Sequence, residues 1–153
     1  MPDNRRRRTR FRRATDNLPG RRITPRDLSL LRHLAAHRFL RSSHFPALIG
    51  GSLQGILRRL ALLYHHGYVE RPRAQLDGYF RLAGSAPIVY SLAPRGAALL
   101  RSHGMPFEEM AWTRQRPPAI GTLFLHHALL VADCAIGAET SCLKHAAAFR
   151  PLR

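Results

Sequence analysis

The sequence predicts a mainly α-helical fold that contains one small β-hairpin and ends in a long apolar helix. Three observations lead to this fold class. Helix-start signals followed by apolar residues at helical spacing recur three times between residues 24 and 66. Two short segments rich in β-branched and aromatic residues follow, and a long apolar segment covers residues 119–143. The 153 residues suffice for one modest core with appendages.

The first helix is expected to begin after Thr24 and to end near His37. Thr24 is a residue type favoured at the N-cap, and Pro25 suits the first helical position because its missing N–H costs nothing there. Asp27 lies three residues after the cap, near the positive end of the helix. Four apolar residues repeat on one face and predict its packed side: Leu28, Leu31, Leu34 and Ala35.

A short second helix and a longer third helix are expected to meet at the corner Gly50-Gly51. Ser42 or Ser43 is the expected cap of the second helix, and Pro46 falls within its first turn. Ser52 is the expected cap of the third helix. At about 100° per residue, six side chains of the third helix form one core-facing arc: Leu53, Ile56, Leu57, Leu60, Leu63 and Tyr64.

The opposite side of the third helix is small, polar and basic. Gln54 and Arg58 are four residues apart and project together, with Gly55 and Arg59 beside them. Arginine pairs with guanine and glutamine with adenine in the major groove of DNA. A glycine inside an exposed helix costs about 1 kcal/mol relative to alanine, so Gly55 indicates close approach of the backbone to a partner. The alternative interpretation is a basic helix face that is only solvated.

Two strands and a fourth helix complete the predicted fold. The segments "YVERPR" (68–73) and "PIVYSL" (87–92) are expected strands of a hairpin, joined by a loop over residues 74–86. In the second strand Ile88, Tyr90 and Leu92 alternate with Val89 and Ser91. The segment "APRGAALLRSHG" then starts a helix at its proline, with Ala97, Leu99 and Leu100 packing on the body. The order helix, helix, helix, strand, strand, helix is that of a winged helix-turn-helix.

The sequence divides into four predicted regions, of which the first is rich in arginine. Residues 1–22 form an arginine-rich arm expected to be unfolded, because like charges repel and no apolar periodicity is present. Residues 23–104 form the winged helix-turn-helix, residues 105–118 a linker, and residues 119–153 an apolar C-terminal region. The last region is interpreted as a dimerisation helix, with a break possible at Gly137, or as the start of a truncated second domain.

The net charge points to a polyanionic partner. The chain has 25 Lys and Arg against 9 Asp and Glu, a formal net charge of +16. Cys134 and Cys142 form no disulfide pattern, which fits the reducing cytoplasm. No secretory signal opens the chain, and residues 119–138 carry two histidines and an aspartate, so we expect a buried or partner-facing helix and no membrane span.

Catalytic, metal and cofactor chemistry finds little support in the sequence. The pairs His65-His66 and His126-His127 are adjacent, so their side chains point in different directions and cannot share one ion. Acidic residues are too sparse for a two-metal nuclease, and no phosphate-binding loop or nucleophile motif is present. Asp133 is interpreted as a packing partner for an arginine or histidine. We therefore expect no enzyme activity, no metal and no cofactor or small-molecule substrate.

Double-stranded DNA is the expected partner, bound by the third helix, the wing and the arm. Flexible basic arms commonly lie along phosphates or enter the minor groove. For the wing arginines the alternative is a hairpin that only closes the core. The predicted DNA-binding residues are Ser52, Gln54, Gly55, Arg58 and Arg59 on the third helix, Arg71, Arg73 and Arg81 on the wing, and Arg5, Arg6, Arg7 and Arg8 on the arm.

Three segments of the chain resemble the replication-relaxation family of bacterial plasmid and mobile-element proteins. They are the "TPRD" start, "RRLALLYHHGYVER" and "VYSLAPRGAALL", and the resemblance runs from about Arg22 to Leu100. It implies a winged helix and DNA binding linked to plasmid replication, relaxation or mobilisation, and it implies no catalytic residue. Family members look longer after a histidine-bearing apolar helix like "LFLHHALLVADCAIGA".

Two other functions remain open from the sequence. A winged-helix transcriptional regulator would use the same DNA-binding residues on a promoter. An RNA- or ribosome-associated basic protein would share the charge, but the sequence shows no aromatic stacking platform. The preferred hypothesis is a cytoplasmic, plasmid-associated DNA-binding protein that pairs as a homodimer through the apolar helix.

Overall fold

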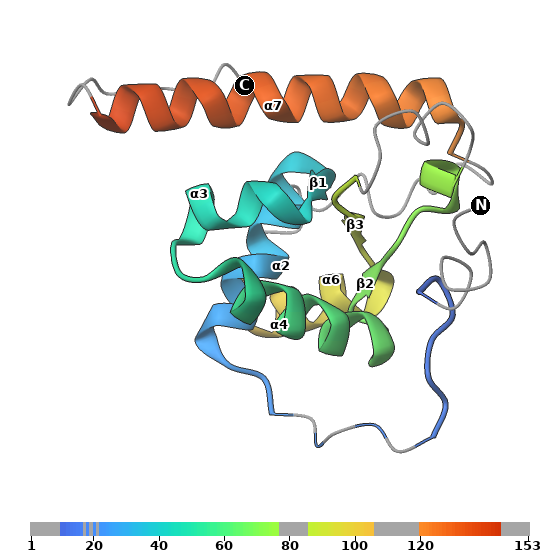
Figure 1. Cartoon of the computed structure of the whole chain (residues 1–153). Coiled ribbons are helices and arrows are strands. Elements are labelled where there is room, and N and C mark those ends of the chain that lie inside the picture. Colours follow the sequence, from blue (N-terminus) through green and yellow to red (C-terminus); the bar gives the residue numbers. More distant parts are fainter. Residues whose placement is uncertain are drawn as a thin grey trace.

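A computed structural model of the chain describes residues 10–16, 18, 20, 22–76, 86–105 and 120–144. Within these ranges the helices and strands follow the order shown in Figure 1. The elements are α2 (Pro25–His37), β1 (Phe39–Arg41), the 3-10 helix η1 (Ser42–His44), α3 (Phe45–Ile49), α4 (Leu53–His65), β2 (Val69–Glu70), the 3-10 helix η2 (Arg73–Leu76), β3 (Val89–Leu92), α6 (Pro94–Ser102) and α7 (Thr122–Lys144). The predicted fold class is confirmed: mainly α, with a small antiparallel sheet and a C-terminal helix.

Helix α2 begins and ends where the sequence predicts. The Thr24 hydroxyl accepts a hydrogen bond from the Asp27 backbone N–H, and the Asp27 carboxylate accepts one from the Thr24 N–H. This reciprocal capping box satisfies two backbone donors that the helix leaves free. The packed face is wider than predicted, because Leu30 is buried together with the predicted residues Leu31, Leu34 and Ala35, while Leu28 is partly buried.

The segment between α2 and α4 differs from the predicted single short helix. Residues Phe39–Arg41 form strand β1, which pairs with β3, and the chain then passes through η1 before α3 begins. The prediction that Ser42 or Ser43 caps the second helix was wrong, since the N-cap of α3 is His44. Arg38 takes a positive φ of 65° between α2 and β1, and this turn redirects the chain into the sheet.

The sheet has three short strands in the order β1-β3-β2, all antiparallel. Strand β2 is shorter than the predicted "YVERPR", since only Val69 and Glu70 pair with β3. All four residues of β3 are buried, because both faces of the sheet are covered. Tyr90 and Leu92 join the core beneath α2, α4 and α6, whereas Val89 packs with Phe39 against α7.

Helix α7 forms a third layer on the side of the sheet opposite α4 and α6 (Figure 1). Its buried residues are Leu125, Leu129, Ala132 and Ile136. The helix runs through Gly137 without a break, so the interruption considered there does not occur. The linker predicted over residues 105–118 lies outside the described residues except for Met105, which packs on the core.

Helix α4 packs its predicted apolar stripe into the core with one exception. Ile56, Leu60, Leu63 and Tyr64 are buried and Leu57 is partly buried. Leu53 is 45% exposed, so its assignment to the core was wrong. It is the first residue of the helix and lies at the edge of the stripe.

Candidate nucleic-acid interface

The start of α4 is fixed by the turn that precedes it. Gly50 and Gly51 have φ angles of 69° and 85°, which glycine adopts readily and other residues do not. Ser52 caps the helix, as predicted, and its hydroxyl accepts a hydrogen bond from the Gly55 N–H at 3.2 Å. Arg26 of α2 reaches across and donates from Nη2 to the Gly50 carbonyl at 2.7 Å. The corner and the first turn of α4 are therefore held in one defined position.

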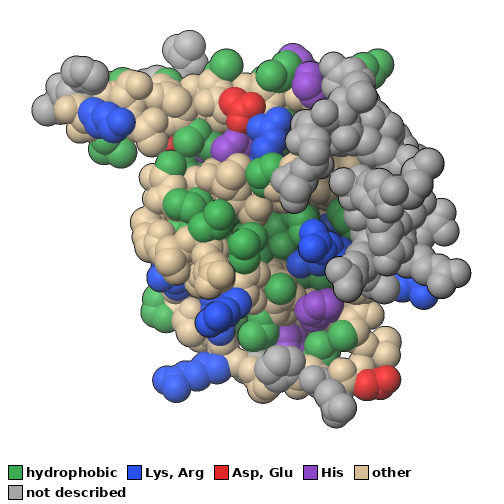
Figure 2. Space-filling view, in the orientation of Figure 1, with side chains coloured by type: hydrophobic (Ala, Val, Ile, Leu, Met, Phe, Trp, Pro, Cys, Tyr) green, Lys and Arg blue, Asp and Glu red, His purple; other side chains and the backbone are tan. Residues whose placement is uncertain are grey.

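The outer surface of this first part of α4 carries Gln54 and Arg58, and both side chains are exposed. Gly55 lies between them along the chain and is partly buried. A Cβ at Gly55 would lie 3.1 Å from the Ser52 hydroxyl and would have no other described side chain within 4 Å outside its chain neighbours, so packing alone does not require glycine. Figure 2 shows Lys and Arg side chains over the lower part of this view, where Figure 1 places α4.

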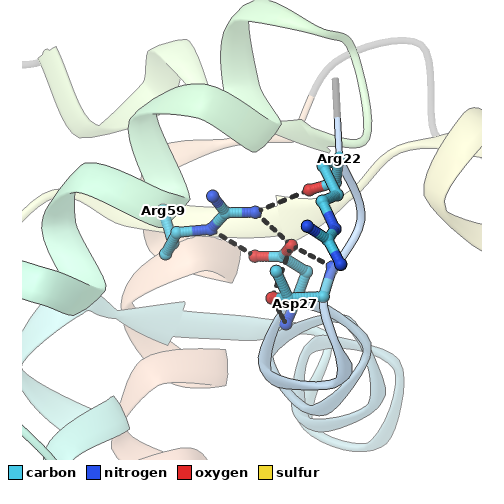
Figure 3. Close-up of polar contacts among 4 residues, drawn as sticks. Arg22, Asp27 and Arg59 are labelled. Carbon is cyan, nitrogen blue, oxygen red and sulfur yellow. Dashed lines mark hydrogen bonds and ion pairs between the residues drawn. The ribbon is translucent and has the colours of Figure 1, made fainter. Parts of the chain in front are cut away.

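Arg59 is directed into the protein, where it joins α4 to α2 (Figure 3). Its Nε donates to Asp27 Oδ1 at 2.8 Å, and its Nη2 donates both to Asp27 Oδ2 and to the Arg22 carbonyl. The same carboxylate accepts hydrogen bonds from the Thr24 N–H and hydroxyl at 2.8 and 2.9 Å. Contact between Arg59 and DNA stays a prediction, and the structure gives this guanidinium a role in the fold.

The ionisation of this pair follows from its contacts. Burial acts to raise the pKa of Asp27, but hydrogen bonds from Arg59 and Thr24 and the Arg59 charge outweigh it, so the pKa is lowered. The hydrogen bond to Asp27 raises the pKa of Arg59. Both groups are therefore charged at neutral pH, and removal of either partner alone would leave the other charge without its partner.

Arg71 follows β2 and is also engaged within the protein. Its guanidinium carbon lies 4.1 Å from the centre of the Tyr64 ring and 5.2 Å from that of Tyr90. Nη2 donates to the Tyr90 hydroxyl at 3.0 Å, and Nη1 donates to the Arg10 carbonyl. Contact between Arg71 and DNA likewise stays a prediction, and the described geometry makes Arg71 a bridge between the sheet, α4 and the N-terminal segment.

The segment that follows β2 extends the sheet by a side chain. Gln75 in η2 accepts the Val89 N–H at 2.8 Å and donates to the Val89 carbonyl at 3.0 Å, which imitates a neighbouring strand. It also donates to the Pro72 carbonyl at 2.8 Å. This explains how β3 remains paired after β2 ends. Arg73, at the start of η2, is exposed.

The remaining predicted DNA-binding residues lie outside the described residues: Arg81 of the wing and Arg5, Arg6, Arg7 and Arg8 of the arm. The structure brings Ser52, Gln54, Gly55 and Arg58 together at the cap and first two turns of α4, and places Arg73 at the start of η2.

Two arginines near this surface were not among the predicted residues. Arg26 bonds to Gly50, and Arg13 bonds to the carboxyl end of α4. The position of Arg26 in the first turn of α2 gave no sign of a contact 24 residues away. Arg13 was missed because the whole segment before residue 23 was expected to be unfolded.

Helix α7 is attached to the body by an ion-pair cluster. Asp133 accepts hydrogen bonds from Arg41 Nη1 at 2.7 and 2.8 Å and lies 2.6 Å from His44 Nε2. The His44 Nδ1 accepts the Arg41 N–H at 3.1 Å, so the ring proton sits on Nε2 and is donated to Asp133. Burial acts to raise the pKa of Asp133, but the bonds to Arg41 and His44 lower it overall. The packing role inferred for Asp133 is confirmed.

The outer face of α7 is apolar. Five of its large hydrophobic side chains are exposed: Leu123, Phe124, Leu130, Val131 and Leu143. Of the helices that the structure describes, α7 alone is long and apolar enough to cross a membrane by length and composition. Its opposite face is buried against β1 and β3. Among the described residues, no group of three or more His, Cys, Asp or Glu side chains is placed to hold a metal ion.

Comparison with known proteins identifies the family of the chain. No match was found among curated proteins or among solved structures. The family model for replication-relaxation matches residues 31–147, which include most of α2 and every later described element through α7. The match extends the resemblance seen in the sequence to the apolar C-terminal helix. The chain therefore belongs to the replication-relaxation family.

Proposed function

We propose that this protein binds double-stranded DNA during plasmid replication or relaxation, with α4 as the recognition helix of a winged helix-turn-helix. The observation that carries the proposal is the surface at the start of α4, where Gln54 and Arg58 are exposed one turn apart on a helix whose first turn is fixed. Helices of this kind contact base edges with residues near their N-terminus. The family membership supports a role on plasmid DNA.

The arrangement around α4 supports this assignment. Helices α3 and α4 meet at the glycine corner, and β2 and β3 follow as the base of the wing, with Arg73 exposed beside it. Arg59 and Arg71 fix α4 against α2 and against the sheet. A recognition helix held rigidly loses little conformational freedom when it enters the major groove. In this proposal Gln54 and Arg58 read bases while Arg73 contacts phosphate.

The proposal also includes the assembly and location of the protein. The exposed apolar residues of α7 fit pairing with a second copy, which would present two recognition helices to one DNA site. The protein then acts in the cytoplasm on plasmid DNA by binding alone, with no reaction, cofactor or membrane attachment of its own. A transcriptional regulator would bind through the same surface, and footprinting on the plasmid origin and on neighbouring promoters separates the two roles.

A competition experiment tests the proposal. Labelled plasmid-origin duplex is bound to the protein at fixed salt and displaced by unlabelled duplex DNA or by RNA of equal length. We expect the DNA to compete at lower concentration, because α4 matches the width of the major groove, whereas A-form RNA has a narrow one. More effective competition by RNA contradicts the proposal and favours the RNA-associated function.

A further inference from the structure

Part of the N-terminal segment lies against the carboxyl end of α4. Arg13 Nε donates to the Tyr64 carbonyl at 2.9 Å, and Arg13 Nη2 donates to the Val69 carbonyl at 3.2 Å. The next residue, Ala14, donates its backbone N–H to His65 Nδ1 at 3.0 Å. A cation is favoured at the end of a helix where the carbonyl groups point outward. One short segment is thus fixed to both α4 and β2.

Stacked side chains reinforce this attachment. The Arg13 guanidinium carbon lies 5.2 Å from the centre of the Tyr64 ring, and Arg71 lies 4.1 Å from the same ring. Arg71 also donates to the Arg10 carbonyl, so two arginines and one tyrosine hold residues 10–14. Tyr64 is buried, and its ring therefore forms a rigid support for both cations.

The segment touches α4 a second time before α2 begins. The Arg22 carbonyl accepts a hydrogen bond from Arg59, which lies about one and a half turns before Tyr64 on α4. In Figure 1 the described parts of residues 10–24 loop out below α4 and return to the start of α2. Residues 10–22 are therefore attached at both ends to the helix that we propose reads DNA.

The charge of this segment is exposed, including that of Arg13, whose side chain also donates to the Tyr64 and Val69 carbonyls. Arg10 and Arg12 are exposed, and the sequence continues toward the N-terminus with Arg8, Arg7, Arg6 and Arg5. We propose that Arg13 is a positioning residue, which fixes the basic arm at the carboxyl end of α4 so that the arm contacts the phosphates of the duplex held by α4. This inference rests on the proposed function of α4.

The contact with His65 requires an unprotonated Nδ1, because this atom accepts the Ala14 N–H. Burial and the nearby charges of Arg71, His66 and Arg13 lower the pKa of His65, which keeps the ring neutral at physiological pH. The attachment is therefore compatible with the cytoplasmic pH at which DNA binding is proposed.

Two substitutions in the full chain separate positioning from charge. Arg13→Gln removes the contacts to Tyr64 and Val69, whereas Arg12→Gln removes the same charge from an exposed neighbour and serves as control. Hydrogen exchange without DNA reports the attachment. We expect exchange in residues 10–16 to accelerate about tenfold or more in Arg13→Gln and to stay unchanged in Arg12→Gln, while α4 keeps its protection in both.

Binding to plasmid-origin duplex over a range of salt concentrations then reports the consequence. If only the lost positive charge mattered, both substitutions would weaken DNA binding equally. We expect Arg13→Gln to weaken binding about tenfold and Arg12→Gln about twofold. Equal losses, or tighter binding by Arg13→Gln, overturn the inference, and tighter binding would show that the segment covers the DNA-binding surface.

The two measurements also separate this inference from the proposed function. If the wild-type chain does not bind duplex DNA, the proposed function fails, and with it the phosphate contact of the arm. Hydrogen exchange then still decides the attachment itself: faster exchange in Arg13→Gln alone supports Arg13 as its anchor, and unchanged exchange overturns it.

Discussion

Neighbouring arginines of α4 serve different purposes according to what lies within reach of each guanidinium. Arg59 meets the buried carboxylate of Asp27 and joins two helices, whereas Arg58 meets solvent and remains available to a partner. A carboxylate without exposed surface keeps its charge only if it is fully paired. Asp27 has three partners, the Arg59 side chain and the N–H and hydroxyl of Thr24, and they explain its burial.

Replacing Asp27 by alanine should lower the free energy of unfolding by about 3 kcal/mol, because the substitution leaves Arg59 without its carboxylate and removes half of a capping box. The lowered pKa of Asp27 also sets a pH dependence. Its contribution is present above the unfolded carboxyl pKa of about 4 and is lost as the pH falls through the lower folded value.

Urea denaturation between pH 2 and pH 7 measures both effects. Asp16→Ala is the control, because Asp16 is exposed. A loss for Asp27→Ala no larger than that of the control would contradict this account of the pair, as would an unchanged acid dependence in Asp27→Ala.

The substitution Gly55→Ala tests whether the α4 backbone approaches a partner. Alanine at this position should change the free energy of unfolding by less than about 1 kcal/mol, since helix propensity favours it and only the Ser52 hydroxyl must give way. Binding to origin duplex should nevertheless weaken tenfold or more, because the added methyl group separates backbone and DNA.

Gly137→Ala is the matched control for this substitution. Gly137 is an exposed glycine inside α7, with open space around its Cβ position. The control should gain up to about 1 kcal/mol of stability and bind DNA as the wild type does. Unchanged DNA affinity in Gly55→Ala, measured by fluorescence anisotropy, would show that Gly55 has no role at a DNA surface.

At the scale of helices and strands, α7 completes the fold by covering the second face of the sheet. Phe39 and Val89 point toward Leu125 and Leu129, while the next residue of each strand joins the other core. The cluster of Arg41, His44 and Asp133 adds a polar contact at the edge of this layer. Two apolar faces and one ion pair thus fix the position of α7.

A double-mutant cycle on Arg41 and Asp133 measures the polar part of this contact. The single alanine variants and the double variant should give a coupling free energy of about 0.5–1 kcal/mol, since Asp133 is 40% exposed and surface pairs contribute little more. In the Asp133→Ala variant, hydrogen exchange should accelerate more in α7 than in α2. Strictly additive losses of stability would show that the ion pair does not hold α7.

The sequence predicted the starts of two helices correctly but missed or lengthened the strands, and the reasons are physical. The start of α2 and the cap of α4 were predicted correctly, because capping depends on residues that are near in sequence. Strand β1 was missed because "FLR" has three residues and is a strand only through its pairing with β3, about fifty residues later. The shortness of β2 has the same kind of cause, since the side chain of Gln75 replaces a backbone partner.

The candidate site shows the same division between local and distant causes. Periodicity placed Gln54 and Arg58 on the outer face of α4, and both are exposed. It did not distinguish Arg58 from Arg59, because the partner of Arg59 lies 32 residues earlier. The attachment of Arg13 to Tyr64 spans 51 residues and had no local signal at all.

At the scale of the whole molecule, the fold separates two kinds of surface. The side of α4 carries exposed basic and amide side chains, and the opposite layer presents the apolar outer face of α7. A chain with a formal net charge of +16 repels its own copies, and a polyanion bound at one side would lower that repulsion while the other side pairs. The proposed DNA binding and pairing are therefore compatible within one molecule.

The most direct test of the central claim is the affinity of Arg58→Ala for origin duplex and for random duplex at one salt concentration. Arg32→Ala, an exposed arginine of α2, is the control for lost charge. If α4 reads bases, Arg58→Ala loses about 1–3 kcal/mol on the origin and much less on random DNA, while the control loses little on either. Equal losses on the two duplexes, or a loss no larger than that of the control, would contradict the assignment of α4 as the recognition helix.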